Sequence, residues 1–156
     1  MAQEIERKFL PASEGWRGRA AGAPYLQGYL CASKEQPVRV RLAGDQAFLT
    51  IKGPSQGISR AEFEYPIPLA DARELFLLCS LPLIEKTRYR IEHAGLIWEV
   101  DEFSGANSGL ILIEVELAFA EQAFVKPDWV GEEVSADSRY TNAMLSRRPY
   151  STWAKE

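Results

Sequence analysis

Residues 86–103 read KTRYRIEHAGLIWEVDEF, and this stretch indicates how the whole chain folds. Charged and apolar side chains alternate on both sides of Ala94-Gly95, where glycine permits a tight turn. Successive side chains of a strand point to opposite faces. The pattern therefore predicts two strands, residues 86–93 and 96–103, paired as a hairpin with one charged face and one apolar face.

The same alternation extends outward along the chain. Together with frequent glycine and proline punctuation, it predicts eight strands and a mainly β, α+β fold. The strands are residues 4–10, 24–31, 38–42, 47–52, 60–66, 86–93, 96–103 and 110–117. A second hairpin is expected at Gly44-Asp45.

Helical signals are few. Ala72, Leu75, Phe76 and Cys79 follow Pro68 at helical spacing, which predicts one amphipathic helix. A second helix is expected to begin near Asp137-Ser138, at good capping residues, and to stop by Pro149. Residues 119–131 are expected to hold a short helix and a loop around Pro127.

Composition limits the function classes. The 156 residues suit one domain spanning 1–156, and the net charge of -4 argues against general nucleic-acid binding. Cys31 and Cys79 match neither a disulfide scaffold nor a zinc site and suit a reducing cytoplasm. No signal region or membrane-length apolar run is present. His93 is the only histidine, which excludes a metal site built from several histidines.

The charged faces are dominated by Arg, Lys and Glu in same-sign pairs two residues apart, and such pairs repel. A closed eight-stranded antiparallel barrel with these faces inward would let opposite signs meet, or let ligands neutralise them. The basic set suits a phosphate chain and the acidic set suits a hard divalent cation. Two other interpretations remain open: a solvated sheet face, and a structural lattice of charges.

Five short motifs carry a family resemblance. Glu4-Ile5-Glu6-Arg7-Lys8 at the N-terminus matches an ExExK motif, and Arg39-Val40-Arg41 matches an RxR strand. The remaining three are 60–64, 86–90 and 114–116, which resemble an ExE, a KxRxR and a second acidic strand. In this order they resemble the CYTH domain family, the triphosphate tunnel metalloenzymes, of the single-domain bacterial inorganic triphosphatase type.

The resemblance implies a divalent-metal-dependent reaction, with Mg²⁺ or Mn²⁺, on a small-molecule triphosphate inside the barrel. The expected metal ligands are Glu4, Glu6, Glu114 and Glu116, with Glu62, Glu64 and Asp101 able to bind a second metal or orient arginines. The expected substrate-binding residues are Lys8, Arg39, Arg41, Lys52, Lys86, Arg88 and Arg90.

The catalytic candidates are Lys86, Tyr29 and Glu116. Lys86 would protonate the leaving phosphate, and Tyr29 would either touch the terminal phosphate or pack in the core. The alternatives in function are an adenylate cyclase, a nucleoside or thiamine triphosphatase, and a non-catalytic polyphosphate-binding module. No nucleic-acid or membrane partner is expected, and a homodimer is compatible with the sequence.

Overall fold

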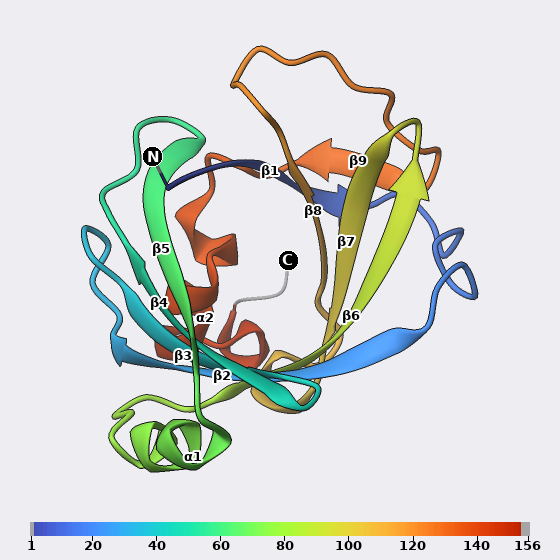
Figure 1. Ribbon diagram of the computed structural model, residues 1–156. Helices are drawn as coiled ribbons and strands as arrows, with labels where there is room; N and C mark the ends of the chain where they lie inside the picture. The colour runs from blue at the N-terminus through green and yellow to red at the C-terminus, as the bar shows by residue number, and fades with distance from the viewer. Residues whose placement is uncertain (1, 154–156) are drawn as a thin grey trace.

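The computed structural model of the chain describes residues 2–153. Eight antiparallel strands form a closed barrel, viewed along its interior in Figure 1. In chain order they are β1 (Gln3–Pro11), β2 (Gly22–Cys31), β3 (Val38–Ala43), β4 (Gln46–Lys52), β5 (Ser59–Ile67), β6 (Ile84–His93), β7 (Leu96–Phe103) and β8 (Ile111–Glu116). The first half of β1 pairs with β5, with Glu4 opposite Arg60, and this pairing closes the ring.

Both predicted hairpins are present. β3 pairs with β4 across Gly44, and β6 pairs with β7 across Ala94-Gly95. Gly44, Ala94 and Gly95 all have positive φ, of 61°, 49° and 84°. Gly44 and Gly95 adopt this conformation without the steric cost that a Cβ brings, whereas Ala94 bears that cost in the first turn position of its hairpin.

The loop expected around Pro127 is present, but the short helix expected in residues 119–131 is not. Instead, Val130–Glu133 forms a ninth strand, β9, which lies outside the ring and pairs with the second half of β1. Gly131 packs against the backbone of this partner, since a Cβ there would stand 3.0 Å from the Leu10 carbonyl oxygen. The pairing joins residues about 120 positions apart in the chain, which local alternation does not predict.

The first predicted helix is confirmed as α1 (Leu69–Leu77), which directly follows Pro68. The second begins later than expected. Asp137 caps only a short 3-10 turn, η2 (Ser138–Tyr140), and Thr141 caps the helix proper, α2 (Asn142–Arg147). Two further 3-10 turns are η1 (Gly105–Asn107) and η3 (Tyr150–Thr152). No helix within residues 2–153 is long and apolar enough to cross a membrane.

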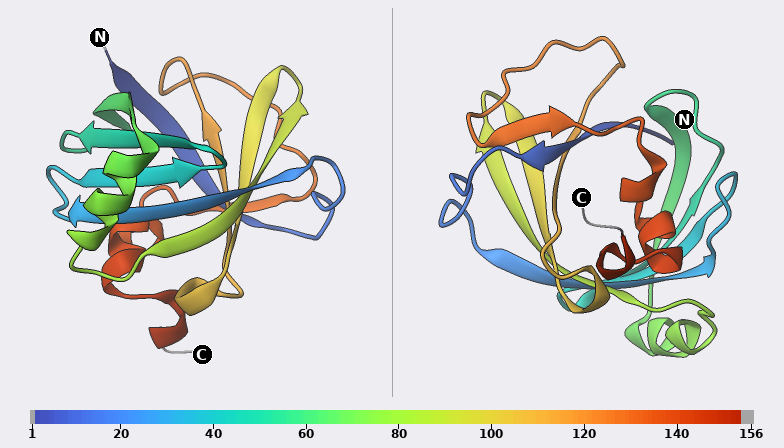
Figure 2. Two further views of the ribbon diagram at one scale, coloured as in Figure 1. Left: turned by 60° about the horizontal axis from the view of Figure 1, so that its bottom comes forward. Right: turned by 180° about the vertical axis from the view of Figure 1, so that it is seen from behind.

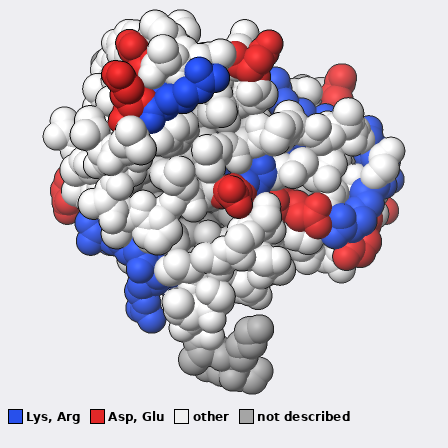
Figure 3. Space-filling model, turned by 90° about the horizontal axis from the view of Figure 1, so that it is seen from below, with Lys and Arg blue, Asp and Glu red and all other residues white. Residues whose placement is uncertain are grey.

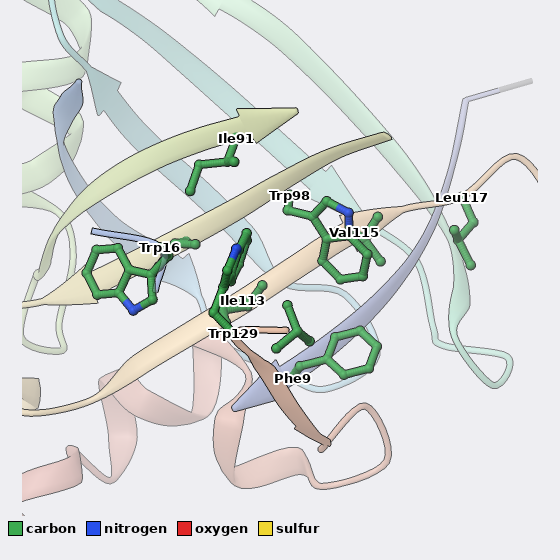
Figure 4. Close-up of a cluster of buried hydrophobic side chains, with 10 residues drawn as sticks. Phe9, Trp16, Ile91, Trp98, Ile113, Val115, Leu117 and Trp129 are labelled. Carbon is green, nitrogen blue, oxygen red and sulfur yellow. The ribbon is translucent and has the colours of Figure 1, made fainter. Parts of the chain in front are cut away.

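The apolar strand faces point outward, but helices cover only part of them. α1 packs on Val40 and Ala47 outside β3 and β4. The larger cluster lies outside β1 and β6–β8, and loops and β9 cover it (Figure 4). Trp16 and Trp129 enter this cluster beside the fully buried Trp98. These tryptophans are therefore packing residues.

A second apolar cluster lies inside the barrel, at one end. Leu10, Tyr29, Ile84 and Leu112 share the inward face with the charged residues, and they pack with Leu145 of α2. The C-terminal turns and α2 lie across this end, which faces the viewer in the right-hand view of Figure 2. The charged part of the interior therefore has an apolar floor.

The outer surface below the barrel differs from this interior. Figure 3 shows the face that carries α1, where uncharged side chains predominate and charged groups are scattered between them. Many of the strands' charges are instead directed into the barrel.

Candidate functional site

A cavity of about 540 Å³ occupies the charged part of the barrel. Every strand except β9 contributes to the ring around it, so residues from the whole length of the chain converge there. The predicted site residues that line it are Glu4, Glu6, Lys8, Tyr29, Arg39, Arg41, Lys52, Glu62, Glu64, Arg88, Arg90, Glu114 and Glu116. Lys86 and Asp101 do not line it; they are buried deeper in the barrel, toward the floor, where Lys86 donates to Asn142 of α2.

Two arginines of β3 form the least neutralised part of the wall. Arg39 donates to Thr50 Oγ1 at 3.2 Å and stands 3.6 Å from Glu64, and its buried Nε has no hydrogen-bond partner. Arg41 Nε donates to the amide oxygen of Gln27 at 3.0 Å. Among residues 2–153, no carboxylate lies within 4.0 Å of Arg41. Two guanidinium groups therefore face the cavity with little counter-charge.

The pKa of Arg41 reflects this environment. Burial, and then the positive charges of Arg39 and Arg88, lower the pKa of Arg41 to about 10. The guanidinium also lies over the ring of Tyr25, at 5.2 Å from the ring centre. An anion in the cavity would relieve the repulsion, and guanidinium forks bind phosphate oxygens in pairs.

The β6–β7 wall supplies its own counter-charges. Arg88 makes two hydrogen bonds to the Asp101 carboxylate, at 2.7 and 2.9 Å, and Lys86 Nζ lies 2.7 Å from the same group. Burial lowers the pKa of Lys86 to about 7, with Asp101 opposing the shift. Although burial opposes it, Lys86 and Arg88 lower the pKa of Asp101. In this arrangement Asp101 is occupied as an ion-pair partner.

The opposite side of the cavity collects carboxylates. Lys52 pairs with Glu4 at 2.8 Å and with Glu62 at 3.5 Å, and Lys8 lies 3.4 Å from Glu114. Glu6 stands between Glu4 and Glu114, within hydrogen-bonding reach of both. β1 and β8 create this crowding because Glu6 pairs with Glu116, and Lys8 with Glu114, across the ladder.

This crowding raises the pKa of two carboxyl groups. Burial, followed by the charges of Glu114 and Glu4, raises the pKa of Glu6 well above its ordinary value. Burial and the contact with Glu4 raise the pKa of Glu62 to about 7. Within residues 2–153, no three Asp, Glu, His or Cys side chains already form a metal-binding group. The oxygen-only, proton-sharing set nevertheless fits a hard divalent cation, which would replace those protons.

The remaining predicted residues lie nearer to solvent or to the floor. Glu116 and Glu64 are exposed at the rim, and the Arg90 side chain is 64% exposed, 3.5 Å from Glu99. Tyr29 lines the cavity and is also part of the apolar floor, so both alternatives for it describe its position.

Sequence reasoning did not assign Tyr25, Gln27 or Thr50 to the site. All three share the inward face of their strands with assigned residues, which is the signal that identifies them. Tyr25 lies between Arg41 and Arg88, and Thr50 bridges Arg39 to Glu64 by hydrogen bonds. Because they are uncharged, an alternation of charged and apolar residues does not by itself mark them as site residues.

The sequence matches the CYTH domain over residues 2–150, which is nearly the whole chain. The chain belongs to the CYTH domain family. It is 47% identical over 151 residues to an inorganic triphosphatase of Acetivibrio thermocellus, covering 96% of this chain and 97% of that protein. It is 40% identical over 147 residues to an inorganic triphosphatase of Nitrosomonas europaea, covering 92% and 96%.

Solved structures agree with this assignment. A crystal structure of the inorganic triphosphatase NE1496 has 37% identity and a TM-score of 0.65, over 91% of this CYTH chain and 96% of that one. A putative adenylate cyclase from Bacillus halodurans has a TM-score of 0.59 at 17% identity, covering 78% and 84%. At that identity the likeness concerns the fold alone.

Proposed function

We propose that this CYTH protein is a metal-dependent hydrolase that cleaves inorganic tripolyphosphate to pyrophosphate and phosphate, as a single domain. The observation that carries the proposal is the division of one cavity into a cation-rich wall and a proton-sharing carboxylate wall. The names of the two relatives that match nearly the full chain support the same substrate.

The basic residues would bind the substrate. Arg39 and Arg41 face the cavity on one strand, two residues apart, which is about 7 Å along a strand. That spacing lets them contact neighbouring phosphates. Lys8, Lys52 and Arg88 add positive charge around the cavity. Stabilising the charge that develops on phosphate oxygens is most of what phosphoryl transfer requires of a protein.

The carboxylates would hold the metal. Glu4, Glu6 and Glu114 are the ligands that the geometry supports best, with Glu116 and Glu62 next to them at the rim. Bound Mg²⁺ or Mn²⁺ supplies Lewis-acid activation of the phosphate and lowers the pKa of a bound water. Glu6 and Glu62 must release their protons for the ligand set to form.

Four of the assigned residues take narrower roles. Lys86 and Asp101 are buried near the floor, bound to each other, so we propose that they support Arg88 from below. Tyr29 would form the floor below the last phosphate. Glu64 would orient Arg39 through Thr50, because Thr50 donates to it at 2.9 Å.

An activity matrix tests the proposal. Purified protein would be given tripolyphosphate, ATP, thiamine triphosphate and pyrophosphate, each with Mg²⁺, Mn²⁺ or EDTA, and released phosphate would be measured. We expect tripolyphosphate to be turned over fastest, and only with metal. Faster ATP turnover would favour a nucleotide enzyme, and binding without turnover would favour a binding module.

The proposal also covers the cellular compartment, the partners and the oligomeric state of the protein. Cys31 and Cys79 are unpaired thiols, which suits a reducing cytoplasm. A triphosphate anion is the expected partner, and neither nucleic acid nor membrane is required. Sedimentation at several protein concentrations would test the homodimer.

A further inference from the structure

We infer that Asn142, at the start of α2, is a positioning residue that sets the orientation of Arg41 by way of Gln27. The inference rests on the proposed function, because it assumes that Arg41 binds phosphate. It adds a role for the C-terminal segment, which otherwise only closes one end of the barrel.

The contacts form one continuous chain from the helix to the arginine. Asn142 Oδ1 accepts from Gln27 Nε2 at 2.9 Å and from Lys86 Nζ at 3.1 Å. The other end of the same amide, Gln27 Oε1, accepts from Arg41 Nε at 3.0 Å. Gln27 has no exposed surface, so water does not compete for either bond.

The direction of these bonds is determined at the Lys86 end. The ammonium group paired with Asp101 has donors only, so it needs the oxygen of Asn142 and not the nitrogen. Gln27 must then approach that oxygen with its own nitrogen, which turns its oxygen toward Arg41. Arg41 is a donor only, so every link agrees with the next. The contacts thus specify one orientation for two amides whose ends are otherwise interchangeable.

Arg41 needs this support more than the other cavity cations do. No carboxylate within the described chain lies within 4.0 Å of it, and the Gln27 amide supplies its one protein hydrogen bond among residues 2–153. Its remaining guanidinium donors face the cavity. A guanidinium held at Nε presents its terminal nitrogens as a pre-oriented fork, which loses less entropy when it binds phosphate.

The helix is firmly placed, as a positioning element must be. Thr141 caps α2 by accepting from the Met144 amide, and Lys8 Nζ donates to the Tyr140 carbonyl at 3.0 Å. Leu145 is buried in the apolar floor. Asn142 is therefore carried by a segment that is attached to the barrel on both sides.

A double-mutant cycle between Asn142→Ala and Arg41→Ala tests the inference. Tripolyphosphate binding would be measured by calorimetry in metal-free buffer, and KM and kcat would be measured with metal. We expect Asn142→Ala to weaken binding and raise KM about 5- to 30-fold in the wild-type background, which lies within the range of coupling between residues of one hydrogen-bond network. In the Arg41→Ala background the same change should cost less than about twofold.

Ser146→Ala is the matched control on the same helix. Ser146 is buried and donates to the Asn142 carbonyl at 3.3 Å, whereas the Gln27 side chain bonds to Asn142 and Arg41. We expect it to leave tripolyphosphate Kd within about twofold. If Asn142→Ala does not fold, Gln27→Met breaks the same chain with a side chain of similar size and must show the same dependence on Arg41.

The outcomes separate this inference from the proposed function. Equal factors in both Arg41 backgrounds, or an unchanged Kd for Asn142→Ala and Gln27→Met, would overturn the positioning role while leaving the hydrolase intact. If wild-type protein binds tripolyphosphate without cleaving it, the hydrolase fails and the cycle is still decided by Kd. If wild-type protein does not bind tripolyphosphate, both fall.

Discussion

The β3 wall and the β6–β7 wall of the cavity carry similar cations with opposite degrees of neutralisation. Arg88 is held by two hydrogen bonds to a buried aspartate, whereas within residues 2–153 Arg41 has an amide and a tyrosine ring beside it but no carboxylate within 4.0 Å. Breaking a buried ion pair leaves an uncompensated charge, so Arg88 and its partner maintain the fold. An uncompensated guanidinium costs stability until an anion arrives. The difference distinguishes cations that are ion-paired within the wall from cations that are available to bind an anionic ligand.

Removing the counter-charge of the β6–β7 wall should have the largest effect. Asp101→Asn leaves buried Lys86 without its carboxylate partner and leaves Arg88 with only the more exposed Glu99, and we expect a loss of about 3–5 kcal/mol in the free energy of unfolding. Urea denaturation measures it. The control is Glu99→Gln, which removes a more exposed partner of Arg88 at 3.4 Å and should cost less than about 1 kcal/mol. Equal losses would mean that the two walls do not differ as described.

The β3 wall should respond in the opposite way. Arg41→Ala, or Arg39→Ala, should lower kcat/KM for tripolyphosphate by about 1.5–3 kcal/mol, roughly 10- to 150-fold. The metal-free protein should not lose stability in Arg41→Ala, because the change also removes repulsion with Arg39 and Arg88. Arg41→Lys keeps the charge but loses the fork, so it should rescue activity only in part. Near-normal kinetics in both alanine variants would contradict a phosphate-binding role for this wall.

The sequence predicts which residues form the two walls, but not which of their cations are ion-paired and which are free to bind a ligand. Alternation with a period of two is local, so it identifies the strands, both hairpins and the inward face of residues such as Arg39 and Arg88. Which charges pair depends on depth along the barrel and on neighbours far away in the chain. Asp101 resembled a metal ligand by its face alone, and only the β6–β7 register shows that Arg88 lies opposite it.

β9 and the exact start of α2 escaped prediction for the same physical reason. The pairing of β9 with β1, and the seating of Asn142 beside Gln27, are long-range contacts with no periodic signal. Asp137 is a good capping residue, but it caps a 3-10 turn. The N-cap of α2 is Thr141, four residues later. A local signal can therefore show that a helix is near without showing where it begins.

The carboxylates of the cavity predict how the thermal stability of the metal-free protein depends on pH. The pKa of Glu6 is raised in the folded protein, so the folded state binds its proton more tightly than the unfolded chain. Its contribution is therefore fully favourable below the unfolded carboxyl pKa and is lost as pH rises through the folded value. Without metal, Tm should fall over this range. Glu62, with a pKa of about 7, should add to the decline up to neutrality.

Glu6→Gln should flatten that pH profile and raise Tm at neutral pH in EDTA. The gain is about 2–4 °C for each kcal/mol of repulsion relieved in a chain of this size. Mg²⁺ or Mn²⁺ should stabilise the wild type increasingly as pH rises, since the cation displaces the same protons. Thermal melts with and without metal measure both effects. A profile that is equally steep in wild type and variant would contradict the assignment of Glu6.

The smallest effect is expected at Arg90, the one predicted substrate-binding residue that lies mostly in solvent. Its side chain is 64% exposed and its contact with Glu99 is 3.5 Å, so water and salt screen its charge. Arg90→Ala should raise KM for tripolyphosphate only about two- to threefold at low salt, a loss of about 0.4–0.7 kcal/mol. At 0.15 M salt the Debye length is about 8 Å, so most of that loss should vanish. Arg41→Ala, with its buried charge, should keep its larger effect under both conditions. A salt-resistant defect in Arg90→Ala would show that this arginine contacts the phosphate chain directly and belongs with the β3 wall.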